Sequence, residues 1–146
     1  MPHTPPPYRN DVSLPLTEAA QENIFKLPVC AACQTVQYPP REICRRCLSD
    51  DLAWQPVSPR GTLLSQVDLH HSLEPYFRDH LPWPTGTVQL ENGAVIICHL
   101  LNGHMATDSK VDMQAVIDPG GRAALVAKPR GAKTISWNDV EQGRKS

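Results

Sequence analysis

Two closely spaced pairs of cysteines constrain this chain more than any other feature of its sequence. The first pair is Cys30-Ala-Ala-Cys33, and the second, after ten intervening residues, is Cys44-Arg-Arg-Cys47. A two-residue spacer lets both sulfurs of a pair reach one ion without straining the backbone. Zn²⁺ takes four thiolates at tetrahedral angles, with Zn–S distances near ~2.3 Å. The pattern therefore predicts one structural zinc ion, held by all four cysteines.

Other uses of the same thiols stay open at this stage. The ten-residue gap is shorter than the roughly 15 to 20 residues usual for such sites, but Tyr38-Pro39-Pro40 forms a rigid extended turn that can return the second pair to the first. Rubredoxin-like iron, a disulfide pair or a redox dithiol are the alternatives. Since four cysteines leave no vacant position for substrate water, the metal is expected to supply folding energy rather than catalysis.

Three arginines stand in or beside the cysteine motif. Arg41, Arg45 and Arg46 are expected to offset the negative charge that four thiolates leave around a dication. They are the predicted second shell of the metal site.

Composition limits the partners and the compartment. The formal net charge is −1 over 146 residues, which argues against a nucleic-acid or anionic-membrane partner, because such proteins usually carry a basic surplus. The start of the chain shows no apolar signal core, and its longest apolar run, 94–98, is far too short to cross a bilayer. Paired cysteines fit a reducing compartment better than a disulfide framework. We expect a cytoplasmic protein that does not enter a membrane.

The first part of the chain divides into an arm and a metal-binding module. Residues 1–14 hold four prolines and predict a flexible arm. Residues 15–56 are predicted to form a short helix followed by the zinc ribbon, with Ser13 as a possible cap and Pro28 as the end of the helix. One face of that helix carries apolar residues, which are Leu16, Ala20, Ile24 and Leu27.

Residues 57–130 show the period-two alternation of short strands. In the first strand Leu63, Val67 and Leu69 form the predicted buried side, opening at Gly61. The five expected strands lie at about 61–70, 87–90, 94–101, 111–117 and 123–127. Glu91-Asn92-Gly93 predicts a hairpin. The chain is therefore predicted to be mainly β, with a five-stranded OB-fold barrel as the economical closure and a small open sandwich as the competitor.

The remaining segment, residues 131–146, is a polar tail apart from three apolar residues. These are Ile135, Trp137 and Val140. The tail is either loose or docked on another part of the protein.

This combination of modules resembles the zinc-ribbon/OB-fold proteins that accompany thiolases and other acyl-CoA enzymes, long known only as a domain-of-unknown-function family. The resemblance covers about residues 16–130 and depends on the order and spacing of several motifs. They are the N-terminal helix, CAAC, Tyr38-Pro39-Pro40-Arg41, CRRC, Leu52-Ala-Trp54, Arg60-Gly61-Thr62-Leu63, Pro82-Trp83-Pro84 and Val88-Gln89-Leu90-Glu91-Asn92-Gly93.

The resemblance implies a fold and a partner rather than a reaction. Family members resemble non-catalytic subunits bound to thiolase-like, ketosynthase-like or aldolase enzymes, sometimes near the mouth of the CoA site. The chain departs from the family at Gln34 and Leu48, where a glycine often follows each cysteine pair. The start of the helix, Thr17-Glu18-Ala19-Ala20, is also small and polar where the family is often aromatic.

The segment between the first two strands is rich in aromatic and proline residues. Tyr76, Phe77, Arg78 and Trp83 are the candidate contacts with a partner or an acyl-CoA, since such residues are over-represented at interfaces. The alternative is a loop folded back as a plug on the barrel.

The remaining candidates for chemistry are histidines and the fifth cysteine. His70, His71 and His99 have no nucleophile or carboxylate at a spacing that predicts a triad. Cys98, in an apolar strand, is expected to be a buried small hydrophobe rather than a nucleophile. No catalytic residue is predicted.

These observations together favour a non-catalytic accessory subunit of a thiolase-like acyl-CoA enzyme, with the CoA ester as a candidate contact. In this hypothesis the ribbon and the N-terminal helix dock on the catalytic subunit. The alternatives are an OB-fold nucleic-acid-binding protein and a rubredoxin-like electron carrier. The first is disfavoured because the five predicted strands contain no Phe, Tyr or Trp on which bases could stack.

Overall fold

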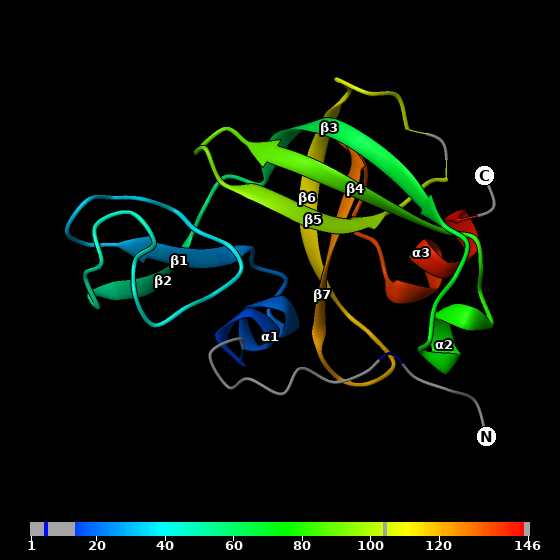
Figure 1. The fold of residues 1–146 in the computed structure, drawn as a ribbon, viewed down its shortest axis with the longest axis horizontal. Helices are drawn as coiled ribbons and strands as arrows, with labels where there is room; N and C mark the ends of the chain where they lie inside the picture. The colour runs from blue at the N-terminus through cyan, green and yellow to red at the C-terminus, as the bar shows by residue number, and fades with distance from the viewer. Residues whose placement is uncertain (1–4, 6–13, 104, 145–146) are drawn as a thin grey trace.

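The computed structural model describes residues 5, 14–103 and 105–144, in which a small two-stranded module stands beside a β-barrel (Figure 1). The predicted flexible arm lies outside the described residues, apart from Pro5 and Leu14. The elements of the small module are α1 (Leu14–Gln21), β1 (Lys26–Cys30) and β2 (Leu52–Pro56). Those of the barrel and its surroundings are β3 (Arg60–Leu69), α2 (Pro75–Arg78), β4 (Trp83–Leu90), β5 (Val95–Leu100), β6 (Lys110–Ile117), β7 (Ala123–Pro129) and α3 (Trp137–Gly143).

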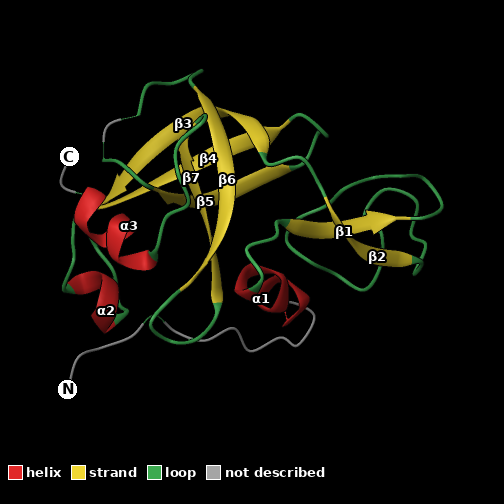
Figure 2. Ribbon diagram, turned by 180° about the vertical axis from the view of Figure 1, so that it is seen from behind, coloured by secondary structure: helices red, strands yellow, loops and turns green. Residues whose placement is uncertain are grey.

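Five strands close the barrel in the order β3-β4-β5-β7-β6, with β6 pairing back onto β3 (Figure 2). All neighbours are antiparallel except β5 and β7, which meet in a short parallel pair, His99 with Val126 and Leu100 with Ala127. The β4–β5 hairpin turns at Glu91-Asn92-Gly93, where Gly93 has a φ of 96°. The predicted mainly β architecture and the five-stranded barrel are confirmed, and the open sandwich is excluded.

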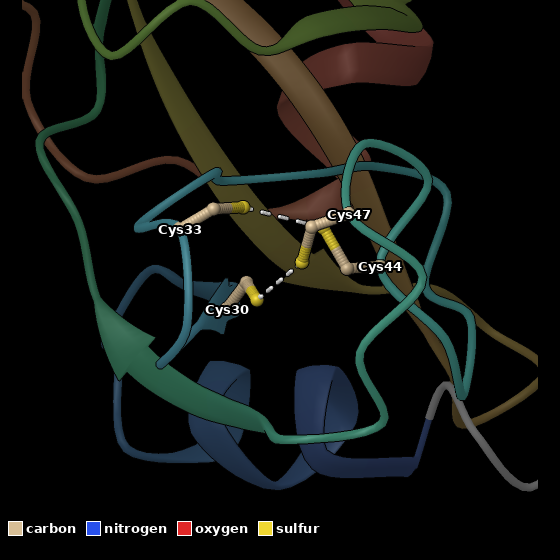
Figure 3. A group of neighbouring side chains, drawn as sticks. All are labelled: Cys30, Cys33, Cys44 and Cys47. Carbon is tan, nitrogen blue, oxygen red and sulfur yellow. Dashed lines mark hydrogen bonds between the residues drawn. The ribbon is translucent and has the colours of Figure 1, made fainter.

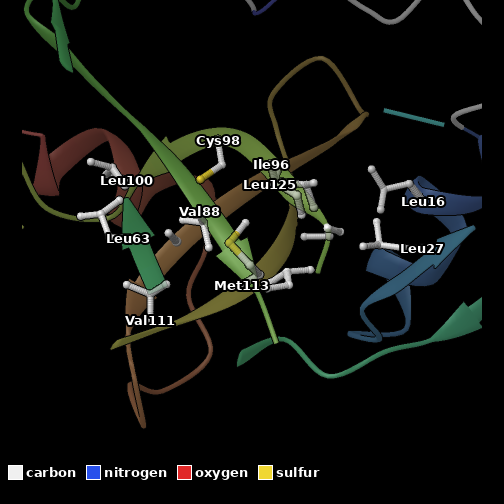
Figure 4. Close-up of a cluster of buried hydrophobic side chains, with 14 of the residues drawn as sticks. Leu16, Leu27, Leu63, Val88, Ile96, Cys98, Leu100, Val111, Met113 and Leu125 are labelled. Atoms are coloured by element: carbon white, nitrogen blue, oxygen red, sulfur yellow. The ribbon is translucent and has the colours of Figure 1, made fainter. Parts of the chain in front are cut away.

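The barrel and the ribbon module share one hydrophobic core. Leu16 of α1 and Leu27 of β1 are fully buried in the same cluster as the barrel side chains Leu63, Ile96 and Leu125 (Figure 4). Burying a leucine side chain contributes about 1.5–3 kcal/mol relative to leaving it exposed. The two modules are therefore joined by packing as well as by the chain.

The N-terminal helix is shorter than the sequence predicted. The apolar face was expected to continue through Ile24 and Leu27 to Pro28, but the helix ends at Gln21 and residues 26–30 form β1. Asn23 takes a φ of 59°, and the backbone N–H of Ile24 donates to the carbonyl of Ala19. A left-handed residue with this bond is the usual way for a helix to stop. The spacing of apolar residues in the sequence fitted a single long helix as well as a short helix followed by a strand, so it could not distinguish the two.

The predicted buried side of the first barrel strand is only partly right. Leu63 is fully buried, but Val67 and Leu69 are 58% and 41% exposed. The register against β4 shifts between Leu63 and Ser65. A bulge inserts one residue and exchanges the two faces of a strand, so beyond it Gln66 rather than Val67 is partly buried. The Gln66 side-chain amide donates to the Gly103 carbonyl and accepts the Met105 N–H.

The polar tail packs onto the barrel as α3. Ile135, Trp137 and Val140 are buried, in a second cluster with Tyr76 and Trp83. The Trp137 indole N–H donates to the Tyr76 hydroxyl at 2.7 Å, and that hydroxyl donates to Glu141 at 3.0 Å. Of the two alternatives for the tail, the structure shows docking over the described residues.

Candidate metal centre and the surface around it

The four paired cysteines converge on one point (Figure 3). Their sulfur atoms all lie within 4.8 Å of one another, with Cys30–Cys47 at 3.5 Å and Cys33–Cys44 at 3.6 Å. A tetrahedral ion with Zn–S bonds of about 2.3 Å requires S···S separations of about 3.8 Å. None of the pairs is a disulfide. The donor set and its spacing fit one four-coordinate zinc ion.

Both cysteine pairs are built on the same backbone turn. In the first, the Cys30 N–H donates to Thr35 and the Gln34 N–H donates back to Cys30. In the second, Cys44 bonds Ser49 and Leu48 bonds Cys44 in the same way, at 2.8 and 2.9 Å. This repeat places two knuckles face to face, with each first cysteine fully buried.

The knuckle turn requires a left-handed residue after the second cysteine. Gln34 and Leu48 have φ values of 64° and 65°, a region that glycine occupies at little cost and other residues at about 1–2 kcal/mol. The departure from the family glycines is therefore a local strain at an unchanged turn.

Two residues that hold the metal site were missed in the sequence. The Thr35 hydroxyl lies 3.0 Å from the Cys33 sulfur. Gln37 is 1% exposed; its Oε1 accepts the Arg45 N–H, and its Nε2 donates to the Ile43 carbonyl. A buried glutamine thus braces the second knuckle. The one sign of this role in the sequence is that Gln37 is a polar residue between the two cysteine pairs.

The hydrogen bonds around the sulfurs prepare some of them to be thiolates. The hydroxyl and the backbone N–H of Thr35 lower the pKa of Cys33 to about 6. The backbone N–H of Cys47 lowers the pKa of Cys44. Because a metal ligand must be deprotonated, such donors favour cation binding.

The three arginines that were expected to offset the charge of the thiolates are exposed. Arg46 donates its backbone N–H to the Cys44 sulfur at 3.4 Å, and the Arg45 N–H serves Gln37. An offset of charge by the guanidinium groups of Arg41, Arg45 and Arg46 stays a prediction.

The second knuckle also exposes apolar side chains. Leu48 is 75% exposed and Ile43 is 51% exposed, and they flank Cys44. Together with Arg41, Arg45 and Arg46 they make up what we call the second-knuckle surface. Leu48 thus combines strained backbone with exposed apolar area, two local costs at one residue.

The candidate partner residues of the α2 segment divide into buried and accessible ones. Tyr76 and Trp83 are 4% and 1% exposed, so both are internal to the folded chain and form the plug that was the alternative. Phe77 is half-buried and stacks over the His99 ring. Arg78 is exposed and donates to the Leu73 carbonyl at 3.1 Å. A contact of Phe77 or Arg78 with a partner stays a prediction.

The barrel histidine and cysteine are structural. His99 Nδ1 accepts the Trp83 indole N–H at 2.9 Å, and burial lowers the pKa of His99 to about 4. Burial also raises the pKa of Cys98 to about 12, and its thiol donates to the Gly86 carbonyl. A neutral imidazole and a protonated thiol fit the core roles expected from the sequence.

The argument against base stacking needs one correction. β4 begins at Trp83, earlier than predicted, so one barrel strand does contain an aromatic residue. Because Trp83 is buried, it is not displayed to a nucleic acid. No helix among the described residues has both the length and the apolar character needed to cross a membrane.

A four-thiolate ribbon joined to a closed five-stranded barrel defines a zinc-ribbon/OB-fold protein. Comparison with protein families matches residues 17–53 to the ChsH2 rubredoxin-like zinc ribbon domain and residues 54–118 to the ChsH2 C-terminal OB-fold domain. Since the two matches are consecutive and span most of the chain, it belongs to the ChsH2 family. The suspected relationship is confirmed.

One relative carries the name of a subunit of an acyl-CoA enzyme. A protein of Thermomonospora curvata named "Probable enoyl-CoA hydratase alpha subunit" is 32% identical over 104 residues, which are 69% of this chain and 31% of that protein. This chain therefore spans about a third of that relative's length.

Two solved structures share the fold. The structure described as the Ltp2-ChsH2(DUF35) aldolase has a TM-score of 0.67 at 23% identity, over 86% of this chain and 98% of the matched chain. A DUF35-family protein of unknown function from Sulfolobus solfataricus has a TM-score of 0.55 at 14% identity, over 81% and 84%. At these identities the likeness bears on the fold alone.

Proposed function

We propose that the chain is a non-catalytic subunit of an acyl-CoA-processing enzyme, such as a thiolase-like enzyme, an aldolase or a hydratase. The names of its relatives support an acyl-CoA context. The metal centre supports a structural role, because four cysteine ligands leave no open position on a zinc ion. In this proposal the catalytic groups belong to the partner.

The observation that most supports a partner is the exposure and backbone conformation of Leu48. Leu48 is 75% exposed and adopts a left-handed conformation that glycine takes at lower cost, which makes it a candidate for coverage by a partner. Residues that depart from the usual conformational preferences often lie at functional sites, where a functional gain offsets the cost in stability. Covering Leu48 and Ile43 on association would supply that gain. The second-knuckle surface is therefore our proposed docking site.

Charge indicates the kind of surface that would cover it. Arg41, Arg45 and Arg46 are exposed and close in sequence to the two apolar side chains, with one exposed acid, Glu42, among them. Arginine is enriched at protein interfaces, and complementary charge increases association rates. The matching surface would present an apolar socket bordered by carboxylates.

The test is co-expression with the acyl-CoA enzyme encoded nearest to the gene of this chain, followed by size-exclusion chromatography with light scattering. A complex of defined stoichiometry is expected. Leu48→Ser is expected to weaken the complex, and Ile97→Ser is its matched control, because Ile97 is a similarly exposed apolar residue, at 72%, on β5 of the barrel rather than in a knuckle. Failure of the two chains to associate, with no change in enzyme activity, would refute the proposal.

A further inference from the structure

A pocket of about 290 Å³ lies where the ribbon joins the barrel. Its walls come from the α1–β1 connection, the β2–β3 connection and the neighbouring strands β6 and β7. Phe25, Val57 and Pro59 give it apolar sides, and among its described lining residues Lys128 supplies the one charge. Its volume is at the small end of the range for ligand sites, about 300–1,000 Å³.

Lys128 is held in place from beneath the pocket. Its side chain is 8% exposed, and Nζ donates to Gln114 Oε1 at 2.9 Å and to the Lys133 carbonyl at 3.1 Å. Gln114 is itself fixed by the tail, accepting the Ile135 N–H and donating to the Ile135 carbonyl. Over the described residues, only two of the three ammonium protons have a protein acceptor.

The charge of Lys128 has no counterion within the pocket. Among the described residues, the pocket lining contains no carboxylate. Asp112 on β6 is the cross-strand partner of Lys128 and its charge raises the pKa of Lys128, but no hydrogen bond joins the two side chains. The Asp112 carboxylate instead accepts the Gly131 N–H at 3.0 Å and lies 3.7 Å from Arg130 Nε. Burial lowers the pKa of Lys128. An anion in the pocket would favour the ammonium form, which is costly to bury alone.

We propose that this pocket binds a small carboxylate with a short unbranched apolar chain. The carboxylate accepts the third ammonium proton of Lys128, and the chain lies against Phe25, Val57 and Pro59. A phosphate ester would leave most of its charge unmatched, because Lys128 is the one cation in the lining. The site lies apart from the second-knuckle surface, so it does not depend on the proposed function.

The test uses three probes on the full, zinc-loaded chain, with binding followed by amide chemical shifts. Hexanoate carries both features, hexanamide has the chain without the charge, and acetate has the charge with almost no chain. We expect saturable one-to-one binding of hexanoate, with shifts at Gln114 and Lys128. A charged hydrogen bond contributes about 1.5–3 kcal/mol, so hexanamide is expected to bind at least about tenfold more weakly. Acetate is also expected to bind more weakly than hexanoate.

Two variants separate the charge from the space. Lys128→Met keeps the length of the side chain and is expected to remove the difference between hexanoate and hexanamide. Val57→Trp fills the pocket from the β2–β3 connection and is expected to abolish binding of both. If Lys128→Met does not fold, the comparison of the three probes on the wild type and the Val57→Trp variant still test whether the pocket binds a carboxylate. Equal binding of hexanoate and hexanamide, equal binding of acetate and hexanoate, or no saturable binding of hexanoate would overturn the proposal.

Discussion

Replacing Leu48 by glycine should stabilise the isolated chain and weaken its association with a partner. Leu48 has a φ of 65°, which costs a non-glycine residue about 1–2 kcal/mol. Glycine removes that cost but loses about 0.5–1 kcal/mol through the greater freedom of the unfolded chain. Since the side chain is 75% exposed, little packing is lost. The expected net change is a gain of up to about 1.5 kcal/mol, or roughly 5 °C in Tm.

The assay combines urea unfolding of the zinc-loaded chain with calorimetric titration against the partner enzyme. Gln34→Gly is the matched control, because Gln34 occupies the equivalent position of the first knuckle with a φ of 64°. Both variants should be at least as stable as the wild type. Leu48→Gly alone should weaken association, by tenfold or more if Leu48 is a central contact. Equal affinities for the two variants would refute the docking argument, and a loss of stability in both would refute the strain argument.

Three further predictions test the metal site, the barrel and the tail. Cys44→Ser, or removal of zinc by a chelator, should unfold the ribbon and lower Tm, as read by circular dichroism and zinc content; an unchanged Tm would contradict the structural role. His99 is neutral in the folded state, with a pKa of about 4 against 6.5 when unfolded. Its contribution to the free energy of unfolding is therefore complete above pH 6.5 and is lost as the pH falls towards 4, by at most ~1.4 kcal/mol per pH unit. His99→Gln should flatten that part of the stability–pH curve relative to the wild type, and an identical slope would argue against a neutral His99. Trp137→Ala should cost about 3–5 kcal/mol in urea unfolding, since the indole is buried, whereas a loss below ~1 kcal/mol would mean that α3 is not part of the cooperative unit.

The metal site was the part of this protein most visible in its sequence. A metal site depends on which residues are the ligands and on their spacing in the chain, and both can be read from a short stretch of sequence. The same holds for the Asn-Gly hairpin between β4 and β5 and for the alternation of β6. The residues that support the metal site were less visible in the sequence. Gln37, for example, forms its hydrogen bonds with Arg45 and Ile43 only once the loop has folded.

The errors arose where tertiary packing overrode a local pattern. The face that includes Leu27 fits a helix by spacing, but Asn23 ends the helix and Leu27 enters the core from a strand. The bulge after Leu63 exchanged the faces of β3, and no residue type announces it. Tyr76 and Trp83 looked like interface anchors, yet Trp137, far along the chain, covers them.

The most direct measurement of the central claim is acyl-CoA turnover by the partner enzyme alone, by this chain alone and by the two mixed in rising proportion. The account predicts no turnover by this chain, and a change in partner activity that saturates at the stoichiometry of the complex. The same titration with Leu48→Gly should saturate only at higher concentration. Turnover by this chain alone, or partner activity indifferent to its presence, would contradict the account.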